Sequence, residues 1–328
     1  MQFAIITTLA ILGTLIIILL GVFVSDFIRR RKSETKYHTR ETVMAYVLMI
    51  PAIILTFVVV ILPIFFSLGY AFTDFDYRYF NEVNFVGFDQ FVKLFKEFFA
   101  HKEIYQAFLH TGFFVIFVVP LQIGLALLLA LFCNNKRRGT TIFKVCFFAP
   151  VAVSLSVTVY LWTIILSSNP DGMMNSFLRL FGIKSQNFFD DGNKILMWMV
   201  IMSAWQGCGY QMLIFLSALG NIRKDLYEAA RVDGANVFQR FKTVTLPGLK
   251  PTFLFILITV FVGACRVLVQ PMLLAKNDPR AMTISYFMYE KGLTDYRVGY
   301  SCAVALIMTF IIGGITFAQR RLLGEKKK

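Results

Sequence analysis

Long apolar runs alternate with short polar segments along the whole chain, and this pattern predicts its secondary structure. Each run has at least the roughly 20 residues that a helix needs to cross a hydrocarbon core about 30 Å thick. The pattern therefore predicts an all-α polytopic membrane protein with about seven transmembrane helices. The predicted spans are residues 4–24, 43–72, 107–133, 141–166, 195–219, 251–275 and 298–317.

The composition agrees with this fold class. Hydrophobic residues make up 57% of the 328 residues, the mean hydropathy is +0.67, and charged residues make up only 16%. An ordinary soluble domain carries about 25% charged residues. The composition therefore excludes a soluble enzyme or binding module and indicates an integral membrane protein.

Lysine and arginine are distributed unevenly between the two sets of alternating loops. The set formed by residues 25–42, 134–140, 220–250 and 318–328 holds 20 of them, whereas the opposite set holds 11. Because positively charged flanks stay in the cytoplasm, the first set is predicted to be cytoplasmic. An odd number of spans then places the N-terminus outside and the C-terminus inside. The formal net charge of +14 comes largely from these clusters beside membrane lipid, so no nucleic-acid partner is expected.

The pattern divides the chain into two regions. Residues 1–42 are predicted to form an extra N-terminal helix with a basic cytoplasmic linker, and residues 43–328 to form the main transmembrane domain. A cleaved signal peptide would have its basic residues in front of the apolar run, whereas here the cluster from Arg29 to Lys32 follows it. The first helix is therefore predicted to be retained.

The chain carries no motif of a known catalytic or metal site. The patterns GxxxxGK, HExxH, GxSxG and GxGxxG do not occur, so the chain is not expected to hydrolyse ATP itself. The three histidines are scattered. Five cysteines lie in or at the ends of apolar spans without CxxC spacing, which predicts buried thiols rather than a disulfide or metal site. These are Cys133, Cys146, Cys208, Cys265 and Cys302.

One polar segment, residues 221–250, separates two predicted spans on the cytoplasmic side. Residues 224–232 suit a short helix in which Leu226, Ala229 and Ala230 share one face. The two alanines leave that face low, so that a partner can approach the backbone closely. Composition alone is equally compatible with an amphipathic loop that lies on lipid.

A turn and a second short helix are predicted to follow. Asp233-Gly234 breaks the first helix, because glycine tolerates backbone angles that other residues avoid and aspartate can cap the next helix. The second helix is expected over residues 235–243. Its apolar side chains, which we expect to fold back onto the transmembrane bundle, are Val237, Phe238 and Phe241.

The amino-acid sequence of this segment resembles the EAA motif in permease subunits of binding-protein-dependent ABC importers. The resemblance extends over nearly all of the chain after about residue 43, and it points to the maltose-type, carbohydrate-uptake permeases. The extra N-terminal helix departs from the simplest, six-helix members. The residues that match the motif are Glu228, Ala229, Ala230, Asp233, Gly234, Ala235, Phe241, Leu246, Pro247 and Pro251.

This resemblance implies a transport subunit of a bacterial plasma (inner) membrane that binds no cofactor of its own. Such a subunit pairs with a second, similar permease and sits on two cytoplasmic ATP-binding subunits, which hold ATP and Mg. It receives a sugar-type solute from an extracellular solute-binding protein. The polar segment would be the coupling helix that docks on the ATPase, with Glu228 as the polar anchor and Gly234 as the turn between the two short helices.

The predicted span 251–275 holds the best candidates for the substrate path. A charged Arg266 within an apolar span is costly unless it faces the bundle interior, a cavity or a partner. Arg266 and Gln270 are four residues apart, so one helical face is expected to present both to an oxygen-rich solute. The alternative is a structural arginine that snorkels or pairs with the second permease. Gln206 and Tyr210, also four apart, are further candidates, although either could serve a helix contact.

Two other functions stay open on the sequence alone. One is import of glycerol phosphate or another polyol derivative, for which an embedded arginine would help to bind the anion. The other is a self-sufficient secondary transporter, which needs ion-coupling acids within its spans. Few acids lie within the predicted spans, which disfavours this second alternative.

Overall fold

The computed structural model describes residues 39–79, 82–134, 139–275 and 279–323. Among these residues, helices joined by turns account for nearly the whole structure, and an antiparallel bridge pairs Thr73 with Phe85. The all-α fold class is therefore confirmed. The predicted span at residues 4–24 lies outside the described residues.

Within the described residues, five helices are long and apolar enough to cross a membrane, or six if one bent pair counts as a single span. They match five of the predicted spans and extend most of them at one or both ends. The membrane-spanning stretches are Leu48–Tyr70, Glu103–Cys133, Gly192–Asn221, Val237–Leu274 and Val298–Leu323.

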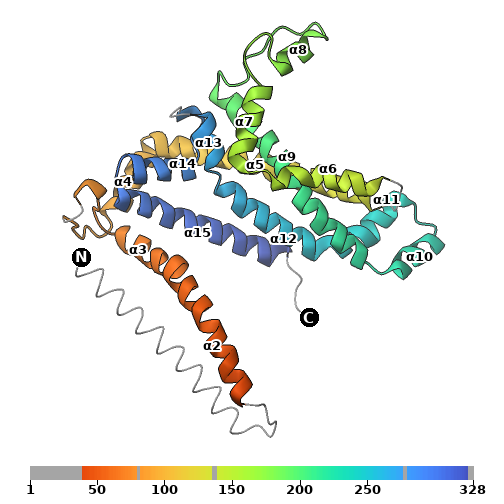
Figure 1. Cartoon of the computed structure of the whole chain (residues 1–328), viewed down its shortest axis with the longest axis horizontal. Coiled ribbons are helices and arrows are strands. Elements are labelled where there is room, and N and C mark those ends of the chain that lie inside the picture. The colour runs from red at the N-terminus through yellow and green to blue at the C-terminus, as the bar shows by residue number, and fades with distance from the viewer. Residues whose placement is uncertain (1–38, 80–81, 135–138, 276–278, 324–328) are drawn as a thin grey trace. The chain divides into compact units, whose positions relative to one another are not determined.

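The prediction of one continuous helix over residues 141–166 is wrong. The chain forms α6 (Thr140–Ala152) and α7 (Leu155–Ile165), which are bent by 104° relative to each other. Val153 is extended, and the Ser154 hydroxyl accepts a hydrogen bond from the backbone N–H of Val157, so a new helix is capped at that point. Figure 1 shows the two helices as separate rods.

The described residues divide into two compact units, the first within residues 39–90 and 296–303 and the second within residues 91–295 and 304–323. In the first unit, α2 (Thr39–Thr56) runs through a π-helical turn, Phe57–Ile61, into α3 (Leu62–Tyr70). The start of α15 (Val298–Leu323) is held there by a hydrogen bond from the Gly299 N–H to the Phe75 carbonyl. A Cβ atom at Gly299 would lie 2.2 Å from the Thr73 carbonyl oxygen, so this contact requires glycine.

The second unit contains a core of long helices. In it α5 (Glu103–Cys133) packs along α9 (Gly192–Asn221), and both contact α12 (Leu246–Cys265). Figure 1 shows α10 (Lys224–Val232) and α11 (Val237–Arg240) at one end of α12 and α13 (Val269–Leu274) at the other. The largest fully buried side chains of this core include Phe114, Met199, Phe215 and Ile256.

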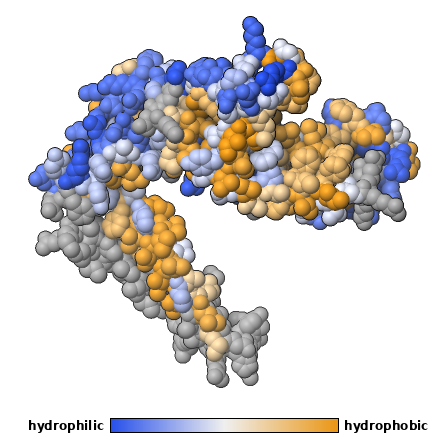
Figure 2. All heavy atoms as spheres, turned by 45° about the horizontal axis from the view of Figure 1, so that its top comes forward, coloured by the Kyte–Doolittle hydropathy of each residue, from blue (hydrophilic) through white to orange (hydrophobic). Residues whose placement is uncertain are grey.

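Figure 2 shows an apolar surface over the middle of the long helices of the second unit, with hydrophilic residues gathered toward its ends. Such a belt suits a helix bundle surrounded by lipid.

Short elements complete the described residues. They are the 3₁₀ turns Tyr77–Tyr79 and Pro279–Ala281, the π-helical turns Phe241–Thr245 and Glu290–Thr294, and the helices α4 (Asp89–Phe99), α8 (Met173–Arg179) and α14 (Ile284–Tyr289).

The cysteine prediction is correct for burial at three positions and wrong at one. Cys133, Cys208 and Cys265 are buried and Cys302 is half-buried, whereas Cys146 is exposed on the outer side of α6. All five carry free thiols in the structure. The described residues contain no cluster of histidine, cysteine and acidic side chains that could hold a metal ion.

Candidate functional site

The polar segment 221–250 folds as two short helices around a glycine turn. The first helix, α10, ends at Asp233, and Gly234 follows with a φ of +78°. The Ala235 N–H donates to the Ala230 carbonyl at 2.9 Å and the Gly234 N–H to the Arg231 carbonyl at 3.1 Å. This pattern is a Schellman motif, and it places the only residue type that adopts a left-handed conformation without strain at the turn. The predicted glycine turn is confirmed.

The second short helix starts later than predicted and is capped by a different residue. Its N-cap is Asn236, whose side chain accepts from the Gln239 N–H at 2.8 Å, while the Gln239 side chain accepts from the Asn236 N–H at 2.8 Å. This reciprocal capping box replaces the predicted cap at Asp233, because Asp233 already ends α10. The helix α11 then continues through the π-helical turn Phe241–Thr245 into α12, whose first turn contains Pro247.

The apolar side of this second helix faces outward, against the prediction. Val237 and Phe238 are 75% and 74% exposed, and only Phe241 is half-buried. The α11 residues form the first turn of the helix that continues through Phe241–Thr245 into α12, and the Val237 and Phe238 side chains lie on the outward side of this turn. Val232, the last residue of α10, is 88% exposed as well, so this polar segment presents several exposed apolar side chains.

The motif residues of α10 lie on the same accessible segment. Glu228 and Ala229 are exposed and Ala230 is half-buried. Among the described residues, Glu228 makes no ion pair. At the start of the helix, Arg223 pairs with Asp225, and this hydrogen bond lowers the pKa of the Asp225 carboxyl. Because the alanine side chains beside the exposed carboxylate are small, another protein can approach the backbone of α10 closely.

Two contacts tie the segment to the base of α12. The Tyr227 hydroxyl lies 3.0 Å from the Thr245 Oγ1, which is buried. At Gly248 an added Cβ would lie 2.9 Å from the Ile222 Cδ1, so the first turn of α12 sits directly against the end of α9. Through these contacts α10 and the end of α9 lie directly against the start of α12.

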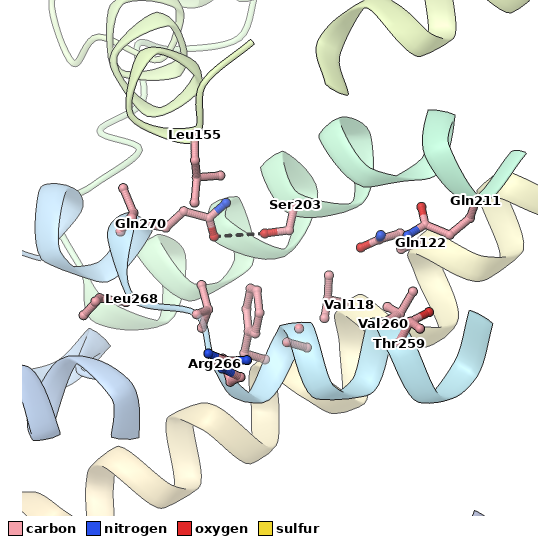
Figure 3. Close-up of a pocket in the computed structure, with 15 residues that line it drawn as sticks. Val118, Gln122, Leu155, Ser203, Gln211, Thr259, Val260, Arg266, Leu268 and Gln270 are labelled. Carbon is pink, nitrogen blue, oxygen red and sulfur yellow. Dashed lines mark hydrogen bonds between the residues drawn. The ribbon is translucent and has the colours of Figure 1, made fainter. Parts of the chain in front are cut away.

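A cavity of about 330 Å³ lies among the long helices near the other end of α12 (Figure 3). Its walls come from α5, α7, α9, α12 and α13 and from the link between α12 and α13, so residues more than a hundred positions apart meet there. Such a cavity is a candidate solute site, because ligand pockets combine apolar walls with a few placed polar groups. Its polar or charged residues are Gln122, Ser203, Gln211, Thr259, Arg266 and Gln270.

The structure brings Arg266 and Gln270 to this cavity, but on different helices. The predicted span 251–275 lies within the stretch Val237–Leu274, but its helix is interrupted, since α12 ends at Cys265 with Arg266 as its C-cap and α13 starts at Val269. Pro271 has no N–H to donate to the Val267 carbonyl, which accepts a hydrogen bond from the Thr283 hydroxyl at 2.9 Å. The break therefore separates the two candidates that sequence spacing placed on one face.

Buried amide side chains form most of the polar lining. Gln270 is 1% exposed and accepts a hydrogen bond from the Ser203 hydroxyl at 2.9 Å. Gln122 and Gln211 are each 8% exposed, and the Gln211 Oε1 has no hydrogen-bond partner in the described part of the chain. A buried oxygen without a donor is unfavourable by about 1–3 kcal/mol.

Sequence reasoning missed Gln122, Ser203, Gln211 and Thr259. The signal available for the two glutamines was a primary amide within an apolar span, which is costly in lipid and usually faces the bundle interior. The spacing along one helix could not reveal their partners on other helices. Gly207 allows this approach, since a Cβ there would lie 2.1 Å from the Gln122 Nε2.

The two weaker candidates lie outside this cavity. Gln206 donates from its Nε2 to the Val153 carbonyl at 2.9 Å, at the break between α6 and α7, so it holds the bend. Tyr210 is 52% exposed and lines a second hollow of about 490 Å³ with Phe148, Asn221 and Thr252. The structure therefore separates both residues from Arg266 and Gln270.

Comparison with known proteins gives a family match over most of the chain. The model of the family described as "Binding-protein-dependent transport system inner membrane component" matches residues 99–326. This range includes the segment 221–250 and every residue that lines the cavity.

Individual relatives agree in length and fold. The "Probable ABC transporter permease protein YesP" of Bacillus subtilis (strain 168) is 32% identical over 299 residues, which cover 89% of this chain and 93% of that protein. The "Arabinooligosaccharides transport system permease protein AraP" of the same organism is 29% identical over 251 residues, covering 75% and 79%. A chain in the crystal structure of a bacterial alginate ABC transporter, in complex with its alginate-bound periplasmic protein, has a TM-score of 0.75 at 22% identity and covers 86% and 94%.

Proposed function

Because the chain belongs to the family of binding-protein-dependent transport system inner membrane components, we propose that its polar cavity passes a carbohydrate while segment 221–250 couples it to an ATPase. The chain is a multi-pass permease subunit of an ABC importer. The observation that carries the proposal is the position of these two sites at the two ends of α12.

The coupling mechanism follows from the geometry of α12. Its 20 residues make a rod about 30 Å long, since a helix rises 1.5 Å per residue. One end is joined to α10 by the hydrogen bond between the Tyr227 and Thr245 hydroxyl groups. The other end forms part of the cavity wall at Arg266. Closure of a docked ATPase would therefore move the cavity wall as a rigid body.

The docking surface combines charge and apolar area. Glu228 offers an unshared carboxylate to a cation on the ATPase, and Val232, Val237 and Phe238 offer a protruding apolar surface. Gly234 fixes the angle between the two short helices. This permease and a second, similar one would sit on two cytoplasmic ATP-binding subunits. These subunits would bind ATP and Mg.

The substrate proposed for the path is a sugar or an oligosaccharide. Amide and hydroxyl side chains in the cavity can donate to and accept from sugar hydroxyl groups. A relative with arabinooligosaccharides in its name supports this class. The solute would arrive from an extracellular solute-binding protein, with the N-terminus of the chain outside and segment 221–250 in the cytoplasm.

Purification in a mild detergent from the native host tests this proposal. A tagged chain should bring with it a second permease and an ATP-binding subunit, identified by mass spectrometry. A chain that purifies alone and transports solute by itself would be a secondary transporter, and the proposal would be wrong. The Glu228→Lys variant serves as the control, because it should insert normally and lose only the ATP-binding subunit.

A further inference from the structure

The short helix α4 (Figure 1) is held by one of its sides against the start of a transmembrane helix. Leu94 and Phe98 are four residues apart and share this side, and Leu94 is buried. The Phe98 ring centroid lies 5.3 Å from that of Tyr105 and 5.6 Å from that of Phe108, both in the first turns of α5. These aromatic contacts fix the end of α4 to the start of α5.

A second side of α4 is apolar and exposed. Val92, Phe95 and Phe99 follow one another at intervals of three and four residues, so they form a stripe along the helix, and all three side chains are exposed. The charged residues Lys93 and Glu97 are four apart on the opposite side. This division of one helix into an apolar stripe and a charged side is typical of helices that lie at a membrane surface.

The length of α5 places α4 at the level of the lipid headgroups. With 31 residues α5 is about 46 Å long, which exceeds a hydrocarbon core of about 30 Å. The excess length lies at its start, where Glu103 and Gln106 are polar, whereas residues 112–133 are apolar apart from Gln122. The first turns of α5 therefore lie outside the hydrocarbon core, and α4 lies beside them.

We propose that α4 lies flat in the membrane surface, with Val92, Phe95 and Phe99 against the lipid acyl chains and Lys93 and Glu97 toward water. The stripe then continues the lipid-facing surface of the membrane-spanning helices. This inference follows from the membrane fold and goes beyond the proposed import function.

The charges of α4 indicate which lipid it needs. Lys93 and Lys96 are matched in number by Asp89 and Glu97, so the helix has no net charge to attract an anionic membrane. Burial of the apolar stripe is then the main force that holds it. A membrane of neutral phosphatidylcholine is therefore sufficient.

Spin-label accessibility in the assembled complex tests the inference. The chain and its co-purified subunits are placed in phosphatidylcholine vesicles, with a nitroxide on Phe95→Cys, Phe99→Cys or, as the matched control on the charged side, Lys93→Cys. Oxygen concentrates among acyl chains, whereas a polar nickel chelate stays in water. The ratio of oxygen to nickel collisions should be about 3- to 10-fold higher at positions 95 and 99 than at position 93, because polar solutes enter hydrocarbon poorly.

Reference positions calibrate this ratio. All variants carry Cys146→Ser, which removes an exposed native thiol, and the chain without an added cysteine measures the remaining background. Ile116→Cys, exposed within the span α5, gives the value for lipid. Lys184→Cys, exposed in the link between α8 and α9, gives the value for water. All of the substituted positions are exposed, so the substitutions should leave the fold intact.

Each outcome decides the inference. Ratios at positions 95 and 99 near that of position 116 support it. Ratios near that of position 184 show water around the stripe and overturn it. Few collisions with either reagent show that another protein surface covers the stripe, which also overturns it. Contact with lipid that appears only after phosphatidylglycerol is added would show that the lysines hold the helix, and the inference would be wrong.

Discussion

The segment 221–250 and the cavity lie at opposite ends of α12 and are built in different ways. The segment is local: its cap, its glycine turn and its exposed Glu228 come from fewer than thirty consecutive residues. The cavity is assembled from five helices, with Gln122 and Gln270 far apart in the chain. Changes in the segment should therefore affect assembly and coupling, whereas changes in the cavity should affect solute selection.

The largest effect is expected from Glu228→Lys. Reversing the charge of an exposed side chain on α10 should leave insertion intact and lower uptake by about 100-fold or more, because one partner of an interface charge pair is worth about 2–5 kcal/mol. Uptake and pull-down of the ATP-binding subunit measure this. The same reversal at the exposed Asp171 should be neutral. Normal uptake with a bound ATPase would contradict the docking role.

A strong effect is also expected from Gly234→Val. A β-branched residue at a φ of +78° is strained by about 1–2 kcal/mol or more, so the turn between α10 and α11 should change its angle. Uptake should fall about 10-fold. The matched control is Gly220→Val, at an open helical position with no atom within 4 Å of an added Cβ. Equal uptake by both variants would show that the turn geometry does not matter.

The cavity should respond to Gln211→Leu with a smaller effect. The substitution replaces a polar amide of the cavity lining with an apolar side chain, so sugar binding should weaken about 3- to 10-fold. Binding of the ATP-binding subunit should stay unchanged, since Gln211 lies away from α10. Saturation-transfer NMR and pull-down separate the two readouts. If this variant no longer bound the ATP-binding subunit, the cavity and segment 221–250 would not have separate roles in solute selection and assembly.

The smallest effect is expected from Tyr227→Phe. It deletes the hydroxyl group that meets Thr245, a contact worth about 1 kcal/mol. The ATP-binding subunit should still bind, and the amount of solute imported per ATP hydrolysed should fall about 2- to 5-fold. Tyr160→Phe, at an exposed position on α7, is the control. An unchanged ratio would show that α10 transmits its motion by another contact.

Local chemistry explains why segment 221–250 was predictable. Gly234 must adopt a left-handed conformation, and no tertiary contact is needed to see this from the sequence. The details that failed, the cap at Asp233 and the burial of Phe238, depended on where one short helix ends and the next begins. A shift of one or two residues at such a boundary changes which way a side chain faces.

The sequence by itself determined the all-α membrane fold, most spans and the motif segment, because apolar length and glycine turns act within a short stretch of chain. The tertiary structure decided the break at Arg266, the bend between α6 and α7, and the meeting of Gln122, Gln211 and Gln270. These features depend on packing between distant helices: the Val267 carbonyl has its partner at Thr283, and Gln122 fits over Gly207. Periodicity along a single helix carries no information about a partner on another.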